Sequence, residues 1–264
     1  MNRRKFIYNS SFASLSVMGL NSCNLLNNDV KLTILHTNDV HSQIEPFPLN
    51  HNEYPNKGGF ARRANIFKGL MKINPNTLIF DAGDIFQGTP YFNFFKGDLE
   101  LNLMKKMGYN AATIGNHEFD AGLKSLKKNK LNNNFQFISS NYNFDNTELE
   151  GLVSKYKVYK RQGIKIGVFG LGIELKGLVN SSLYKETKYY DPVEIAKEMT
   201  RKLKEEKKCD LIICISHLGH TYQNDKISDL KLGKLTSDID LIIGGHTHTL
   251  LKKPEIIKNS KNED

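Results

Sequence analysis

The chain reads Thr77-Leu78-Ile79-Phe80 and then Asp81-Ala82-Gly83-Asp84, an apolar run followed at once by a turn that carries carboxylates. A short, fully apolar run of this kind is typical of a strand buried on both faces of a sheet. In open α/β sheets, ligands bind at the carboxyl ends of the strands. Asp84 is therefore the first candidate site residue.

The pattern of short apolar runs and amphipathic stretches continues on both sides of this segment. We expect further strands at Leu32–Leu35, Ala111–Ile114, Phe135–Ser139, Lys165–Phe169, Leu211–Ile215 and Leu241–Ile243. We expect helices at Phe60–Ile73, Asp98–Met107, Leu123–Lys130, Val193–Lys207 and about Asp225–Thr236. A hairpin over Val158–Gly172, turning at Gln162-Gly163, indicates a second sheet. The order predicts an α/β fold.

Composition excludes several classes of protein. With 264 residues, 39% hydrophobic and 25% charged, the chain is long and apolar enough for a sizeable core. This excludes disordered, collagen-like and repeat proteins. The net charge of +9 includes Arg3, Arg4 and Lys5 and falls to +6 without residues 1–22, so no nucleic-acid groove is expected.

The N-terminus predicts export and a lipid anchor. Residues 1–22 are interpreted as a signal peptide, 23–30 as a tether and 31–264 as the folded domain. Asn2-Arg3-Arg4-Lys5-Phe6-Ile7 resembles a twin-arginine export signal, and a general secretory signal is the alternative. Leu20-Asn21-Ser22-Cys23 resembles a lipobox, in which Cys23 would be lipidated, and a plain cleavage site is the alternative. The expected location is the periplasm or cell envelope, with the protein tethered to a membrane.

Cys209 and Cys214 flank a predicted strand, so an extended chain holds them too far apart for a disulfide. We expect both to be buried thiols.

Side chains that can bind a metal follow five of the predicted strands, close to each carboxyl end. They are Asp39 and His41, Asp84, Asn116 and His117, His217, and His246 and His248. A lone histidine after a strand is more often structural than a ligand. Five coincidences at corresponding strand ends nevertheless favour a metal site, because these ends meet in one crevice.

The donor types define the expected metals. Apart from His117, the set is Asp39, His41, Asp84, Asn116, His217, His246 and His248, with no cysteine. Such donors favour divalent Zn, Mn or Fe over a cysteine-rich structural zinc site. Seven ligands are too many for one tetrahedral ion and suit two ions that share one carboxylate.

Taken in order, the motifs resemble those of the calcineurin-like metallophosphoesterases. These are Asp39-x-His41, Gly83-Asp84, Gly115-Asn116-His117-Glu118, His217 and Gly245-His246-Thr247-His248. Flanking residues such as Ile85-Phe86-Gln87-Gly88-Thr89-Pro90 are similar to the bacterial exported 5'-nucleotidase branch, and the similarity spans about Lys31 to Leu251. It implies a layered metallophosphatase sandwich of two mixed sheets flanked by helices. It also implies hydrolysis of phosphate monoesters, converting 5'-nucleotides to nucleosides and phosphate.

The resemblance also implies roles for single residues. One ion would be held by Asp39, His41, Asp84 and His248, and the other by Asp84, Asn116, His217 and His246, with Asp84 bridging. His117 would contact the phosphoryl group or protonate the leaving oxygen, and Asp120 would orient His117. Asp120 could also cap the next helix. Glu118, His36, His51 and His220 are interpreted as structural or peripheral.

Exported 5'-nucleotidases carry a second domain that grips the nucleoside, and we expect this chain to lack it, together with the closing strands of the metal domain. A separately encoded subunit could then complete the site. The alternatives are a phosphodiesterase for cyclic nucleotides or nucleotide sugars on the same site, or an inactive metal-binding fragment that needs a partner.

Overall fold

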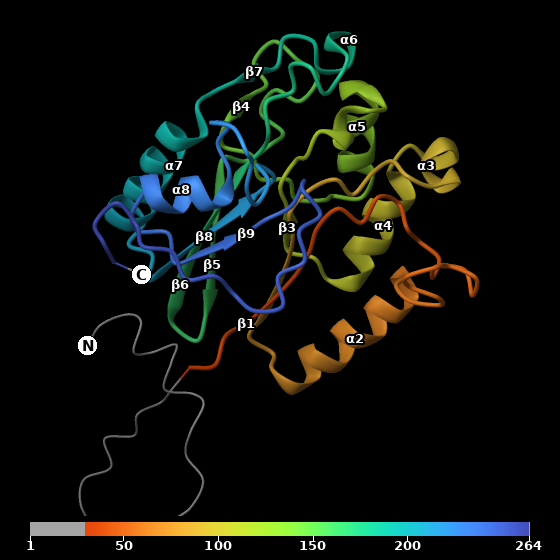
Figure 1. The fold of residues 1–264 in the computed structure, drawn as a ribbon, viewed down its shortest axis with the longest axis horizontal. Coiled ribbons are helices and arrows are strands. Elements are labelled where there is room, and N and C mark those ends of the chain that lie inside the picture. The colour runs from red at the N-terminus through yellow and green to blue at the C-terminus, as the bar shows by residue number, and fades with distance from the viewer. Residues whose placement is uncertain (1–29, 264) are drawn as a thin grey trace, which may run out of the picture. The chain divides into compact units, whose positions relative to one another are not determined.

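A three-stranded parallel sheet forms one half of the sandwich (Figure 1). Its order is β1 (Thr33–Thr37), β2 (Thr77–Asp81) and β3 (Ala111–Ala112), with Thr33 opposite Thr77 and Phe80 opposite Ala111. Every residue of β2 is buried, as its apolar sequence predicted. The computed structural model describes residues 30–263. The interpretations of residues 1–22 and Cys23, and nearly all of the expected tether, lie outside this range.

The second sheet has the order β5-β6-β8-β9. Strands β5 (Tyr156–Arg161) and β6 (Ile164–Leu171) form the expected hairpin, while β8 (Leu211–Ser216) and β9 (Leu241–Ile243) join β6 in parallel. Gln162 and Gly163 form the turn with φ of 46° and 84°, values that glycine adopts readily. Within the described residues β9 pairs with β8 alone.

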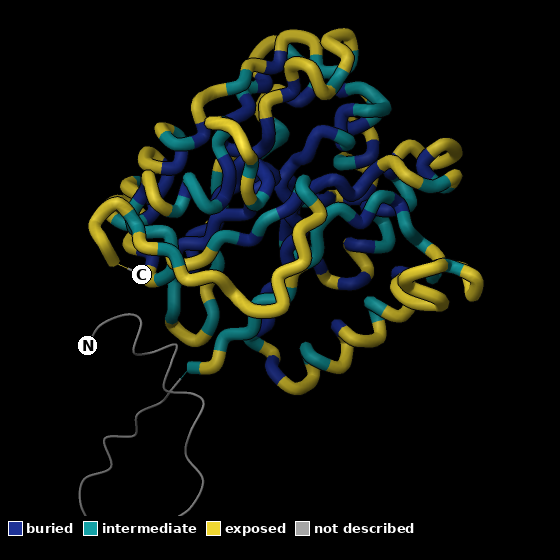
Figure 2. Tube along the Cα trace, in the orientation of Figure 1, coloured by how far each residue is buried: buried dark blue, intermediate teal, exposed yellow. Residues whose placement is uncertain are grey.

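The two sheets pack face to face because their apolar side chains alternate. Phe80 of β2, Val168 of β6 and Ile213 of β8 belong to one buried cluster between the sheets. The neighbouring residues Ile79, Phe169 and Ile212 point the other way and pack under helices. Because side chains alternate between the two faces of a strand, each strand contributes to the core between the sheets and to a core beneath the helices. Figure 2 shows the buried chain concentrated in these central strands.

Helices cover both outer faces, giving an α/β/β/α order of layers (Figure 1). Helices α2 (Phe60–Ile73), α4 (Asp98–Met107) and α5 (Gly122–Asn132) pack against the first sheet. Helix α7 (Pro192–Arg201), the π-helical turn η2 (Lys202–Glu206) and α8 (Asp229–Leu235) pack against the second. The remaining elements are α3 (Pro90–Phe95), η1 (His117–Phe119), β4 (Tyr142–Asn143), α6 (Ser181–Tyr184) and β7 (Lys188–Tyr189).

Most predicted elements are confirmed, and the differences have local causes. The expected strand Phe135–Ser139 makes only isolated bridges at Phe137 and Ile138. The expected helix from Asp225 begins at Asp229, because the Ser228 side chain accepts a hydrogen bond from the Lys231 N–H and caps it there. The long helix expected to Lys207 ends its α-helical part at Arg201 and continues as a π-turn.

Cys209 and Cys214 are buried thiols, as expected. No helix within residues 30–263 combines the length and the apolar character needed to cross a membrane.

Candidate metal centre

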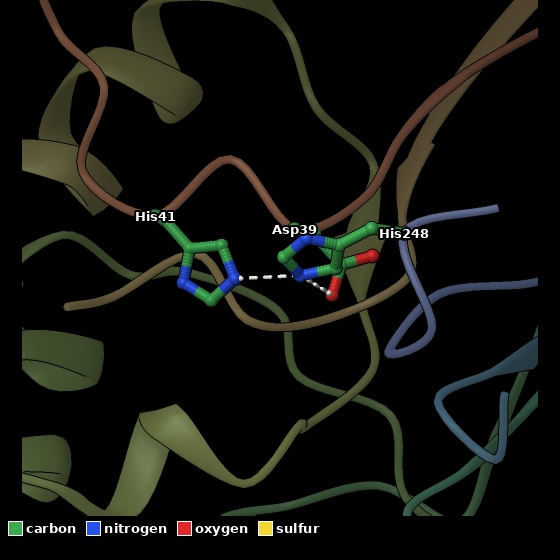
Figure 3. A group of neighbouring side chains, drawn as sticks. All are labelled: Asp39, His41 and His248. Atoms are coloured by element: carbon green, nitrogen blue, oxygen red, sulfur yellow. Dashed lines mark hydrogen bonds and ion pairs between the residues drawn. The ribbon is translucent and has the colours of Figure 1, made fainter. Parts of the chain in front are cut away.

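The first cluster joins the loop after β1 to the loop after β9. Asp39, His41 and His248 each direct a ligand atom into one small region (Figure 3). The Nε2 atoms of His41 and His248 lie 3.1 Å apart, and His248 Nε2 lies 3.4 Å from Asp39 Oδ1. Asp39 also accepts hydrogen bonds of 2.9 and 3.0 Å from the His246 N–H, which ties the two loops together.

A second cluster surrounds Asp84 at the end of β2. Asp84, His217 and His246 form one group of potential ligands, and Asp84 also belongs to a group with His41 and His117. Asp84 Oδ2 lies 3.0 Å from His217 Nε2, and both side chains are at most 3% exposed. The carboxylate of Asp84 therefore lies between the histidines of the two clusters.

One buried atom in the centre, Asn116 Oδ1, has no hydrogen-bond partner within the described part of the chain, and His217 Nε2 has only its 3.0 Å contact with Asp84 Oδ2. Unpartnered buried polar atoms are unfavourable unless an ion or water satisfies them. Carboxylate, amide and imidazole donors at these positions fit divalent cations, so the residues present are suited to the metals that the sequence predicts.

The backbone at the ligands is strained. Asp39, His41, Asp84, His246 and His248 have φ between 44° and 73° in the left-handed region. Non-glycine residues adopt this region rarely, and such strain persists where surrounding contacts hold it. The loops after β1, β2 and β9 therefore turn tightly where they carry these ligands.

Glycines allow the ligand loops to approach closely. A Cβ atom on Gly115 would lie 2.3 Å from Asp84 Oδ1 and 2.8 Å from His217 Nε2. A Cβ on Gly83 would lie 2.7 Å from the Gly115 nitrogen. Any larger residue at either position would push the loops of β2 and β3 apart.

Burial and neighbouring charges set the protonation of the centre. Burial opposes ionisation of Asp84, but His217 beside it and the His117 N–H hold the pKa of Asp84 well below its ordinary value. Burial lowers the pKa of His246 to about 4, with His217 adding to the effect. Burial therefore favours the neutral imidazole of His246, the form that binds metals.

His117 and Asp120 form a pair at the edge of the centre. His117 Nδ1 lies 2.7 Å from Asp120 Oδ2, and the His117 N–H donates to Asp84 Oδ1 at 2.9 Å. The hydrogen bond that His117 donates to Asp120 raises the pKa of His117 despite partial burial. The Asp120 side chain does not cap helix α5, whose cap residue is Ala121.

Two buried acids lie beside the ligand loops. Glu118, expected to be structural or peripheral, is structural: it is completely buried and accepts hydrogen bonds from backbone N–H groups of both ligand loops. Sequence reasoning missed the other acid, Asp81. Asp81 accepts from the Gly83 N–H at 2.9 Å and from the Thr37 hydroxyl at 2.5 Å. Burial raises the pKa of Asp81 to about 8. The available signal for Asp81 was an acid three positions before the predicted ligand Asp84.

The other histidines lie outside the two clusters. His51 packs on Phe47 with ring centroids 4.5 Å apart, in the loop after β1. His220 lies 3.4 Å from Glu255, and its backbone N–H donates to the Thr247 hydroxyl at 3.0 Å. His220 thus supports the turn between His246 and His248.

The fold and the centre define a metallophosphatase-type α/β domain, in which strand ends gather aspartate, asparagine and histidine around a shared carboxylate. The family described as calcineurin-like phosphoesterase matches residues 32–250, and the chain belongs to this family.

Similar proteins include 5'-nucleotidases from several bacteria. The 5'-nucleotidase of Vibrio vulnificus is 34% identical over 243 residues, covering 87% of this chain and 43% of the relative. The NAD 5'-nucleotidase of Haemophilus influenzae is 33% identical, covering 86% of this chain and 38% of the relative. The crystal structure of a 5'-nucleotidase precursor from Thermus thermophilus is 33% identical with a TM-score of 0.80, covering 88% of this chain and 47% of that one. The chain thus spans less than half the length of these relatives.

Proposed function

We propose that this chain hydrolyses phosphate monoesters, with 5'-nucleotides as the substrate class and a nucleoside and phosphate as products. The observation that carries the proposal is the position of Asp84, which shares one group of potential ligands with His41 and another with His217. The 5'-nucleotidases among the similar proteins support the substrate class.

In this proposal, two divalent ions occupy the clusters. Asp39, His41, Asp84 and His248 hold one ion, and Asp84, Asn116, His217 and His246 hold the other. The donor set suits Zn, Mn or Fe. When bound, such ions polarise the phosphoryl oxygens and lower the pKa of water. The protein fixes the spacing of the ligand side chains, because the left-handed turns and the close approach at Gly115 hold the ligand loops in place.

His117 and Asp120 are the proposed catalytic pair. With Nδ1 of His117 occupied by Asp120, Nε2 is the ring atom left to face the substrate. The raised pKa of His117 favours the protonated ring, which can stabilise charge on the phosphoryl group and donate a proton from Nε2 to the leaving oxygen.

We further propose that a nucleoside-binding region completes substrate recognition, in the same polypeptide or in a separate subunit. The greater length of the 5'-nucleotidases that the chain resembles supports this proposal. The N-terminal motifs support export and lipid anchoring at Cys23. Membrane fractionation of cells that make the wild type or Cys23→Ala tests the anchor, since only the wild type should partition with the membrane.

The test of the function is phosphate release by the purified full chain in the presence of Mn²⁺ or Zn²⁺. AMP, p-nitrophenyl phosphate and bis-p-nitrophenyl phosphate are compared, with Asp84→Asn as the matched inactive variant. We expect hydrolysis of both monoesters by the wild type alone. Preference for the diester would favour a phosphodiesterase, and turnover of none of the three with metal bound would contradict the proposal for the isolated chain.

A further inference from the structure

The carboxylate of Glu118 joins the two loops that carry the central ligands. Its Oε1 atom accepts a hydrogen bond of 2.7 Å from the Ile85 N–H, and its Oε2 atom accepts one of 2.9 Å from the Asp84 N–H. Oε2 also accepts a bond of 2.6 Å from the Gly115 N–H. One side chain thus holds the loop after β2 and the loop after β3.

Complete burial makes these bonds important. Glu118 is 0% exposed, and a buried carboxylate is tolerated only when its oxygens are well hydrogen-bonded. Hydrogen bonds from backbone N–H groups to a carboxylate are stronger than neutral ones. These N–H groups, together with that of Phe86 at 3.4 Å from Oε1, in turn depend on Glu118, because without it they would be buried without their acceptor.

The residues that donate to Glu118 include the proposed ligand Asp84 and Gly115, the direct neighbour of the proposed ligand Asn116. Asp84 has a left-handed φ of 56°, which needs support from its surroundings. Gly115 directly precedes Asn116, whose amide oxygen is buried and has no hydrogen-bond partner in the described part of the chain. Glu118 therefore fixes the backbone from which Asp84 and Asn116 extend.

We propose that Glu118 is a positioning residue that holds Asp84 and Asn116 at the spacing required by two neighbouring divalent ions. The inference rests on the proposed two-metal site, and Glu118 itself contacts neither ion nor substrate. Glutamine cannot replace it, because the amide nitrogen is a donor and would face a backbone N–H instead of accepting from it.

The test compares Glu118→Gln with Leu203→Ala. Leu203 is completely buried against the outer face of the second sheet, where a Cβ on Gly167 would lie 3.0 Å from it. Leu203→Ala therefore lowers stability without touching the ligand loops. The measurements are Mn²⁺ affinity and stoichiometry by calorimetry, the Mn²⁺ electron paramagnetic resonance spectrum of the pair, and the melting temperature without metal.

We expect Glu118→Gln to weaken the binding of at least one Mn²⁺ by about tenfold or more, which is the usual effect of losing a residue that orients metal ligands. The electron paramagnetic resonance signal of coupled Mn²⁺ ions should be weaker in Glu118→Gln than in the wild type. Excess Mn²⁺ should restore most of the phosphate release by this variant. Leu203→Ala should melt at a lower temperature and bind Mn²⁺ as the wild type does.

Unchanged Mn²⁺ affinity in Glu118→Gln, at whatever melting temperature, would overturn the inference. If that variant does not fold, Glu118→Asp is used, which keeps the carboxylate but is one methylene too short to reach both loops. Wild-type Mn²⁺ affinity in Glu118→Asp would equally overturn it. A wild type that binds two Mn²⁺ ions but releases no phosphate would refute only the proposed activity, since the affinities still test Glu118.

Discussion

Asp120 Oδ2 lies 2.7 Å from His117 Nδ1, three residues earlier in the chain. The two side chains are 24% and 34% exposed, so the pair borders solvent at the edge of the metal centre. His117 is held from its other side as well, because its backbone N–H donates to Asp84. His117 thus contacts Asp120 through its ring and the central carboxylate of Asp84 through its backbone N–H.

We predict that His117→Ala lowers kcat for AMP by about 10²- to 10⁴-fold, the usual contribution of a general acid. Asp120→Asn should lower it less, because the imidazole remains but loses the carboxylate that orients and charges it. Steady-state kinetics at saturating Mn²⁺ measure both effects. Mn²⁺ affinity serves as the control and should stay near the wild-type value in both variants, since a large loss would make His117 a metal ligand instead.

Asp84→Asn should lower the rate of phosphate release by more than about 10³-fold. It should also lower the number of Mn²⁺ ions bound per chain, because the Asp84 carboxylate belongs to both clusters. Equilibrium dialysis and phosphate release measure the two effects. Asp225→Asn is the matched control, since the Asp225 side chain is fully exposed and its ion pair within residues 30–263 is a 3.9 Å contact with Lys231. Activity that survives in Asp84→Asn would rule out the bridging role.

Removal of metal should abolish turnover and lower the melting temperature. A ligand that binds only the folded state stabilises it, by about 2.7 kcal/mol at a concentration one hundred times its Kd. Dialysis against a chelator, followed by addition of Mn²⁺, should therefore lower and then restore the melting temperature of the wild type. The same titration should change the melting temperature of Asp84→Asn far less. Equal shifts in both proteins would place the metal elsewhere.

Asp238 should contribute stability that depends on pH. Partial burial opposes its ionisation, but hydrogen bonds from Lys204 and Lys261 lower its pKa to about 2 from the ordinary value of 3.8. Because the folded-state pKa is the lower one, the contribution is present above about pH 4 and disappears as the pH falls towards 2.

Asp238→Asn should consequently be less stable than the wild type at pH 6, by about 1 kcal/mol or less, as is usual for ion pairs near the surface. The difference should shrink below pH 4. Urea denaturation at several pH values measures it, with Glu205→Gln as the control, since the exposed Arg201–Glu205 pair is 3.8 Å apart. A constant difference across this range would show that the ion pair is not responsible.

Elements with strong local signals were predicted well. Helix α2 and helix α4 begin and end at the predicted residues, and the turn at Gln162-Gly163 was placed correctly. Segments that depend on their neighbours were predicted less well. Ile138 lies in an apolar run, yet it makes only an isolated bridge with Ser154, because the pairing of a strand depends on distant residues.

The sequence alone determined which chemical groups the centre contains. Apolar runs are followed within a few residues by Asp39, Asp84, Asn116, His217 and His246, and parallel strands bring their carboxyl ends to one edge. The resemblance also implies that Asp84 is shared, and the structure places Asp84 in one group with His41 and in another with His217. Only the tertiary structure decided the use of Glu118 to hold two loops, because this depends on distances between segments that lie far apart in the chain, which local residue patterns do not encode.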